Sequence, residues 1–156
     1  MYKIVFIIII LLFITTQGLQ GLQTTQEDKN GDGKPDMWMT LDDNKRPVKI
    51  EIDRNYDGTL DMWINYYDKG KRLTEIDVNF DGRPDMRTWY EYGQRVKLEI
   101  DTDYNGTIDQ RSEYRDGKTV KLERDTNNDG VLEVIFDISN RRSNIIQQKI
   151  ETKSSQ

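Results

Sequence analysis

Five copies of one acidic loop pattern recur along the chain, and they restrict its fold more than any other feature. The copies read DKNGDGKPD, DRNYDGTLD, DVNFDGRPD, DTDYNGTID and DTNNDGVLE. Each has an oxygen-bearing side chain at its first, third, fifth and ninth positions and glycine at its sixth. The starts of the last four copies, Asp53, Asp77, Asp101 and Asp125, are 24 residues apart, and Asp28 precedes Asp53 by 25. Such a period is typical of tandem-repeat proteins.

The spacing of oxygen donors in each copy predicts a calcium site. Calcium takes six to eight oxygen ligands, and alternate side chains of a tight loop can converge on one ion. The sixth-position glycine permits the sharp bend or positive φ that the loop needs, and the seventh residue can offer its carbonyl. The sequence therefore predicts up to five bound Ca²⁺ ions. The predicted ligands are Asp28, Asn30, Asp32, Lys34 and Asp36; Asp53, Asn55, Asp57, Thr59 and Asp61; Asp77, Asn79, Asp81, Arg83 and Asp85; Asp101, Asp103, Asn105, Thr107 and Asp109; and Asp125, Asn127, Asp129, Val131 and Glu133.

Turn formation alone explains these loops less well. Asn-Gly and Asp-Gly pairs make good turns, but a turn does not require three acids in every copy. Fifteen of the chain's 28 acids lie in the loops, and without a cation the three carboxylates of one loop would repel each other. Five calcium ions would change the formal net charge of −5 to about +5.

The residues around the loops argue against the EF-hand. An EF-hand needs a bidentate glutamate at its twelfth position and a helix on each side. The twelfth positions here hold Met39, Ile64, Thr88, Ser112 and Phe136. The flanks, among them MWINYY, RTWYEY and VKLEI, are rich in β-branched and aromatic residues and predict strands.

The ninth-position acid and the β-type flanks resemble the hairpin calcium loops of the integrin alpha-subunit propeller. The chain is more similar to exported bacterial tandem-repeat proteins that alternate D-x-N-x-D-G-x-x-D with W-x-x-Y and a glycine turn. DRNYDGTLDMWINYYDKGKRLTEID is one such unit, and the resemblance covers residues 28–137. The resemblance implies calcium loops carried on β-hairpin repeats.

A second kind of turn lies between successive acidic loops, with the sequences DDNKRP, YDKGK, YGQ and RDGK. Strands joined by such short links must be antiparallel. We therefore predict an all-β fold, an antiparallel meander of about ten short strands in 24-residue hairpin repeats, with the calcium loops along one rim.

If the first and ninth residues of each loop lie opposite each other, the register of the two flanking strands follows. This register pairs Ile52 with Met62, Ile76 with Met86, and Leu122 with Phe136. The same face should carry Ile50, Ile64, Tyr66, Tyr90, Leu98, Ile100 and Tyr114. The opposite face should pair Glu75 with Arg87 and Glu99 with Arg111. The fourth loop residue is aromatic in the middle copies, and Tyr56, Phe80 and Tyr104 are expected to stack between neighbouring loops.

The N-terminal segment MYKIVFIIIILLFITTQG predicts a signal peptide, because a single cation precedes an apolar run too short to span a bilayer as a helix. The expected organisation is a signal peptide at 1–18, a linker at 19–27, the five-loop domain at 28–139, and a C-terminal cap or frayed tail at 140–156. The expected location is secreted or the cell envelope, with membrane attachment only if the signal segment is not cleaved.

Composition limits the function. The chain contains no histidine and no cysteine, which excludes the commonest general base and thiol nucleophile and argues against an enzyme. The acidic balance argues against nucleic acid as a partner. A 35% hydrophobic content predicts a thin core that metal must support, since disulfides are excluded.

Two functions remain open, and both place an unknown protein or glycan partner at the cell surface. The first is a calcium-rigidified scaffold for surface adhesion or protein binding. The second is a carbohydrate-binding module that uses Trp38, Trp63, Trp89 and Tyr67 as stacking platforms. A calcium sensor fits poorly, because a rigid meander offers no two-state element for the ion to bias.

Overall fold

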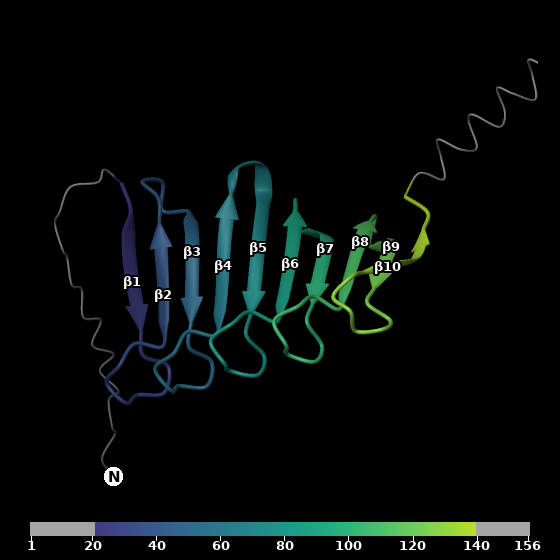
Figure 1. Cartoon of the computed structure of the whole chain (residues 1–156). Coiled ribbons are helices and arrows are strands. Elements are labelled where there is room, and N and C mark those ends of the chain that lie inside the picture. The colour runs from purple at the N-terminus through teal and green to yellow at the C-terminus, as the bar shows by residue number, and fades with distance from the viewer. Residues whose placement is uncertain (1–20, 140–156) are drawn as a thin grey trace, which may run out of the picture.

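The computed structural model describes residues 21–139, which form one antiparallel sheet of ten strands in sequence order (Figure 1). The strands are β1 (Gln23–Glu27), β2 (Met37–Leu41), β3 (Pro47–Ile52), β4 (Met62–Tyr67), β5 (Lys71–Ile76), β6 (Met86–Glu91), β7 (Gln94–Ile100), β8 (Gln110–Arg115), β9 (Lys118–Arg124) and β10 (Glu133–Asp137). A single 3₁₀ turn, η1 (Asp68–Gly70), joins β4 to β5. The predicted all-β meander is confirmed.

The ends of the chain lie outside the described residues, and so do the signal-peptide prediction and the expected cap or tail at 140–156. The segment 19–27 is not all linker, because β1 pairs with β2 from Gln23 to Glu27. The sheet thus begins before the first acidic loop. Within residues 21–139, no helix has the length and apolar character that crossing a bilayer requires.

The hairpin turns on the rim opposite the acidic loops explain why consecutive strands pair. Tyr92 and Gly93 have φ values of 48° and 79°, and Asp116 and Gly117 have values of 51° and 73°. Two consecutive residues with positive φ form the type I′ turn, whose twist matches that of two antiparallel strands. The sequences YGQ and RDGK therefore produce the tight hairpins β6–β7 and β8–β9.

The predicted register is confirmed. Ile52 pairs with Met62, Ile76 with Met86, and Leu122 with Phe136. We call this side the apolar face. Its row nearest the acidic loops is apolar at Met37, Ile52, Met62, Ile76, Met86 and Ile100 and continues through the polar residues Gln110 and Arg124. Arg72 interrupts the same face between Tyr66 and Tyr90.

The opposite side, which we call the charged face, holds a cross-strand ladder of Trp38, Glu51, Trp63, Glu75, Arg87, Glu99, Arg111 and Glu123. Arg87 Nε lies 3.1 Å from Glu75 Oε1, and Arg111 Nε lies 2.8 Å from Glu99 Oε1. Burial raises the pKa of Glu99, but hydrogen bonds from Lys97 and Arg111 outweigh it, so this pKa falls below its ordinary value. Charge pairs of this kind stabilise one register over a slipped one.

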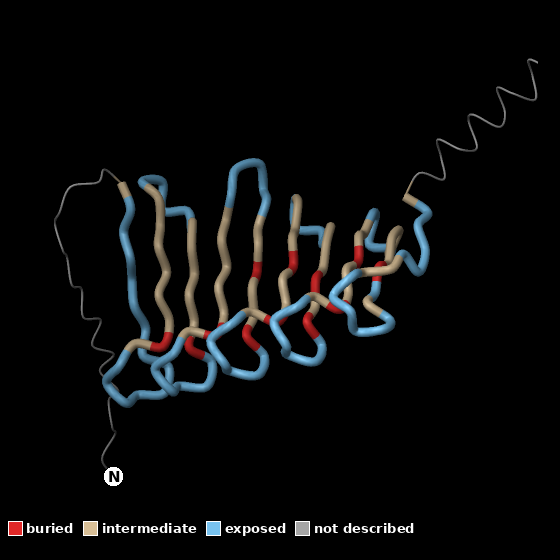
Figure 2. Tube along the Cα trace, viewed as in Figure 1, coloured by how far each residue is buried: buried red, intermediate tan, exposed pale blue. Residues whose placement is uncertain are grey.

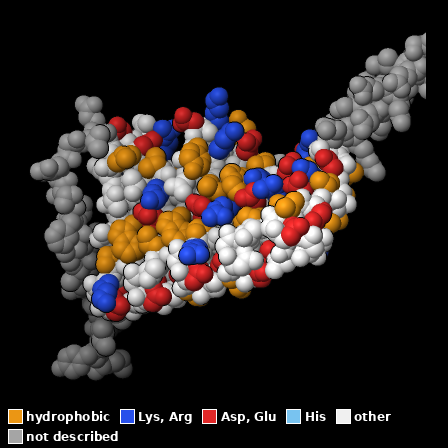
Figure 3. Space-filling view, in the orientation of Figure 1, with side chains coloured by type: hydrophobic (Ala, Val, Ile, Leu, Met, Phe, Trp, Pro, Cys, Tyr) orange, Lys and Arg blue, Asp and Glu red, His pale blue; other side chains and the backbone are white. Residues whose placement is uncertain are grey.

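Residues 21–139 form a single layer in which no hydrophobic core is present. Among residues 21–139 no hydrophobic side chain is buried, and the twelve buried residues are all polar or charged. Figure 2 shows buried segments where the strands meet the acidic loops, and Figure 3 shows basic, acidic and hydrophobic side chains mixed on one exposed surface. Most domains pack two layers around an apolar core. This sheet must therefore draw stability from other interactions.

Candidate metal centre

The five acidic loops lie side by side along one rim of the sheet (Figure 1). They connect β1 to β2, β3 to β4, β5 to β6, β7 to β8, and β9 to β10. This arrangement follows from the meander, because every second link returns to the same rim. Each predicted ligand therefore lies on this rim, in the loop that the sequence assigns to it.

The first aspartate of each loop accepts hydrogen bonds from the loop's own backbone. In the second loop, Asp53 Oδ1 accepts from Tyr56 N at 2.7 Å and Asp53 Oδ2 accepts from Gly58 N at 2.7 Å. The same bond from the sixth-position glycine occurs in the other four loops, at 2.7 to 2.8 Å. A carboxylate that accepts several backbone N–H bonds folds the loop around itself.

The ninth residue closes each loop from the other end. Asp61 Oδ2 accepts from Arg54 N at 2.8 Å, and the corresponding acid accepts from the second residue's N–H in every other loop. In the fourth loop the Thr102 hydroxyl also donates to Asp109, and this bond holds the pKa of Asp109 below its ordinary value. One oxygen of the ninth residue is thus occupied by the backbone, and the other remains for another partner.

The third, fifth and seventh residues form a second, more exposed set. Asn55 Nδ2 donates to Asp57 Oδ2 at 2.8 Å, and Thr59 N donates to Asp57 Oδ1 at 2.7 Å. These bonds, that from Asn55 first, lower the pKa of Asp57. The seventh residues of the other loops, Lys34, Arg83, Thr107 and Val131, likewise donate their N–H to the side chain of the fifth residue.

The sixth-position glycines have the predicted positive φ, between 83° and 93°. The fourth residue also has positive φ, which its residue types in the middle loops do not predict. Tyr56, Phe80 and Tyr104 have values of 63° to 64°, although bulky residues rarely adopt this region. They are 43–49% exposed, so the expectation that they stack between loops is not fully met. Phe80 does lie under Arg54 of the preceding loop, with the guanidinium carbon 5.7 Å from the ring centroid.

About half of the loop acids are buried, and few cations lie beside them to balance their charge. Seven of the twelve buried residues are first- or ninth-position aspartates, with 1–8% exposure: Asp36, Asp53, Asp61, Asp77, Asp85, Asp101 and Asp109. Across residues 21–139, the one ion pair made by a loop acid joins Arg54 Nε to Asp61 Oδ1 at 3.6 Å. Asp61 Oδ1 is buried and accepts no hydrogen bond from the described residues. Buried carboxylates in this state favour a bound cation.

Two loops bring three acids together closely enough to hold a metal ion. Asp101, Asp103 and Asp109 each place one carboxylate oxygen within 4.8 Å of the others, and Asp125, Asp129 and Glu133 do the same. In the described part of the chain, the first three loops form no such three-acid group. Every loop except the fourth has asparagine at its third position, whose amide oxygen would be an additional donor.

Neighbouring loops are joined directly by backbone hydrogen bonds. The N–H of each first-position aspartate donates to the carbonyl of the ninth residue in the preceding loop. These bonds are Asp53 N to Asp36 O, Asp77 N to Asp61 O, Asp101 N to Asp85 O, and Asp125 N to Asp109 O, at 2.8 to 2.9 Å. Both residues of each bond are predicted ligands, so the geometry of one loop restrains the next.

The fold and the rim together define a class: a single-layer antiparallel meander with a row of carboxylate loops along one edge. Comparison with known proteins found no matching family model, no similar curated protein and no similar solved structure. Inferences about function therefore depend on the chain's own geometry.

Proposed function

We propose that the acidic loops bind calcium and that calcium makes the sheet a rigid scaffold for adhesion or protein binding at the cell surface. The observation that carries the proposal is the contrast in burial. Seven of the twelve buried residues are first- or ninth-position aspartates of the loops, while no hydrophobic side chain among residues 21–139 is buried. A sheet whose most buried groups are carboxylates needs cations where other domains use an apolar core.

The donor chemistry favours calcium over other metals. The ligands are carboxylates, amide oxygens and backbone carbonyls, and the chain has no histidine or cysteine to attract zinc or copper. Magnesium requires a smaller, near-ideal octahedron and gives up its water reluctantly. The N-terminal segment predicts export from the cell. Export would bring the loops into contact with calcium at about millimolar concentration, where sites of modest affinity are occupied.

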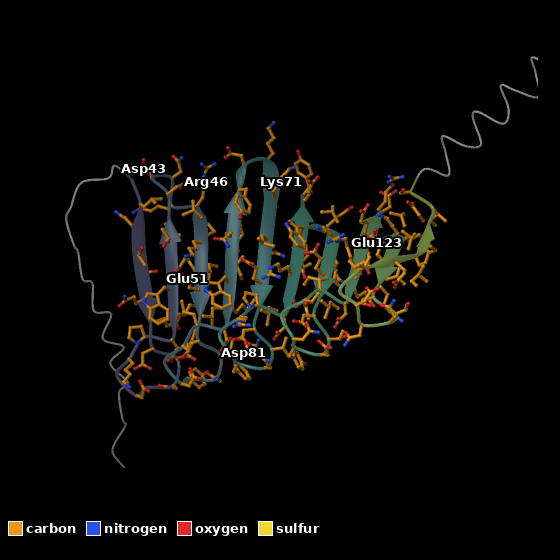
Figure 4. All side chains as sticks on the ribbon, viewed as in Figure 1. Asp43, Arg46, Glu51, Lys71, Asp81 and Glu123 are labelled. Carbon is orange, nitrogen blue, oxygen red and sulfur yellow. The ribbon has the colours of Figure 1, made fainter. Side chains whose placement is uncertain are left out.

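Calorimetric titration of the purified protein with calcium tests the proposal. We expect up to five bound ions, and one fewer in Asp81→Ala, which removes the fifth residue of the third loop. Asp43→Ala is the matched control, since Asp43 is an exposed aspartate on the opposite rim (Figure 4). Fewer than three bound ions, or equal stoichiometry in the two variants, would contradict calcium loops.

A carbohydrate-binding function is the second candidate, and the strand register favours it at one place. Trp38 and Trp63 both pair with Glu51 on the charged face, so two indoles flank one carboxylate. Trp89 is less available, because Lys97 Nζ lies 4.3 Å from its ring centroid. A glycan array probed with protein in calcium and in chelator tests this candidate. Saturable sugar binding that Trp63→Ala abolishes would support it, and an array without signal would exclude the sugars displayed.

A further inference from the structure

A groove on the rim opposite the acidic loops lies where three hairpin turns meet. It has a volume of about 720 Å³ and is lined by residues of the β2–β3, β4–β5 and β6–β7 turns and of the strands below them. Arg46 and Lys71 lie on this rim (Figure 4). Tyr92 N donates to Gly70 O at 2.9 Å, which ties two of the turns together. Backbone hydrogen bonding thus fixes the relative position of two of the turns that form the groove.

The groove is basic in a protein that is acidic overall. Four cations line it, Arg46, Lys69, Lys71 and Arg72, against two acids, Asp42 and Asp68, a difference of +2. The whole chain carries −5. Arg46 pairs with Asp42 at 2.7 Å, and Lys71 pairs with Glu91 at 3.0 Å. Lys69 is exposed, where water solvates its charge.

Arg72 is the half-buried cation of the groove, and it has no acid partner within residues 21–139. Its Nε is buried and donates no hydrogen bond to a described residue. The strand register places Arg72 between Tyr66 and Tyr90. The guanidinium carbon stands 4.1 Å from the Tyr90 ring centroid, so stacking holds the charge in place. A partly desolvated cation of this kind favours an anion beside it.

We propose that this groove binds an acidic saccharide, with its carboxylate beside Arg72 and its sugar ring against Tyr66 or Tyr90. Arginine matches the planar geometry of a carboxylate. A tyrosine offers a flat apolar face together with a hydroxyl, which suits a ring that has apolar and polar surfaces. An acidic peptide shares the carboxylate but lacks the ring. The site goes beyond the proposed calcium function, because the groove shares no residue with the loops.

Calorimetry with three probes tests the proposal: a hyaluronan tetrasaccharide, neutral chitotetraose and tetraglutamate. We expect the first to bind best, and to bind about 10- to 100-fold more weakly to Arg72→Gln, because a charge-assisted contact is lost. Tyr66→Leu should weaken binding too. Arg87→Gln is the control, since Arg87 pairs with Glu75 on the charged face. Absence of binding, equal binding of chitotetraose, or equal or tighter binding of tetraglutamate would overturn the proposal.

Two further measurements separate this site from folding and from calcium binding. Circular dichroism and melting curves show whether Arg72→Gln is folded. If it is not, binding of hyaluronan by the unmodified protein must weaken as salt rises, because salt screens a charge contact; salt-independent binding would overturn the proposal. Asp81→Ala should lose a calcium ion but keep the saccharide, whereas Arg72→Gln should keep its calcium and lose the saccharide.

Discussion

At the scale of single residues, the loop acids combine two roles that usually belong to different side chains. Asp53 and Asp61 accept backbone hydrogen bonds that shape the second loop, and both are buried. A neutral side chain could shape the loop, but it would not attract a cation. Substitutions that separate shape from charge therefore test which role dominates.

Asp61→Asn should stabilise the protein at low calcium, and this gain should shrink or vanish at high calcium. Its side chain can still accept from Arg54 N, but the buried charge at Oδ1 is gone. At micromolar calcium the variant should be more stable by about 1 kcal/mol, because it removes a buried charge that is offset only by the long, 3.6 Å ion pair with Arg54. At millimolar calcium it should forfeit one ion, about 0.4–1.4 kcal/mol, which reduces or cancels that gain.

Melting temperatures at the two calcium levels, with exposed Asp68→Asn on the opposite rim as the control, check this expectation. If Asp61→Asn changes the melting temperature equally at both levels, Asp61 is not a ligand.

Gly58→Ala should destabilise the protein by about 1–2 kcal/mol in urea unfolding. Gly58 has a φ of 93°, and a Cβ added there meets no atom within 4 Å. The loss would therefore come from the backbone conformation and not from a clash. Tyr56→Asn is the comparison, because asparagine tolerates the positive φ of that position, 64°. A Gly58→Ala protein as stable as the unmodified one would mean that the loop relaxes to another shape.

At the scale of the element, each loop and its two strands form a unit that is hydrogen-bonded to the next unit. Asp77 N donates to Asp61 O, and Asp101 N donates to Asp85 O. An ion that orders Asp85 thus orders the start of the fourth loop as well. We expect calcium affinities of neighbouring loops to be coupled, as nearest-neighbour interfaces are in repeat proteins.

Asp81→Ala should accordingly weaken calcium binding in the loops on either side of the third. Amide signals of the sixth-position glycines report each loop during a calcium titration followed by NMR. The midpoints of Gly58 and Gly106 should move to higher calcium, while those of Gly33 and Gly130, two loops away, should move less. Unchanged midpoints in all four loops would show that the loops bind independently.

At the scale of the whole molecule, one open layer must remain folded with no buried hydrophobic side chain among residues 21–139. Extracellular calcium modules bind at roughly 10⁻⁴ to 10⁻³ M. At about 1 mM calcium, five such sites contribute ~2–7 kcal/mol, comparable with the whole stability of a typical domain. Charge pairs such as Glu99–Arg111 favour one strand register and contribute a smaller amount to the stability.

Chelation should therefore unfold or loosen the protein, and its melting temperature should rise with calcium and much less with magnesium. Circular dichroism in calcium should show sheet with very little helix. The same melting temperature in calcium and in chelator would mean that the loops are only turns and that the sheet is stable without metal.

The sequence by itself determined what depends on short-range geometry. Asp53, Gly58 and Asp61 are close in the chain, so their spacing predicts a loop. A two-residue period then places Ile52 opposite Met62 and Glu99 opposite Arg111, as the strands confirm. The segment QTTQE has no alternation of apolar and polar residues, so the sequence places it in the linker, and it becomes β1 only by pairing with β2. The positive φ of Tyr56 was missed because aromatic residues seldom adopt it.

Only the tertiary structure decided how distant segments meet. Segments far apart in the chain create the bond from Asp77 N to Asp61 O and the groove between three turns. They also isolate Arg72 between Tyr66 and Tyr90. A second layer of structure would be needed to cover the apolar face, and the described residues form one layer. The loop pattern is local chemistry repeated along the chain, whereas burial and charge pairing are properties of the assembled sheet.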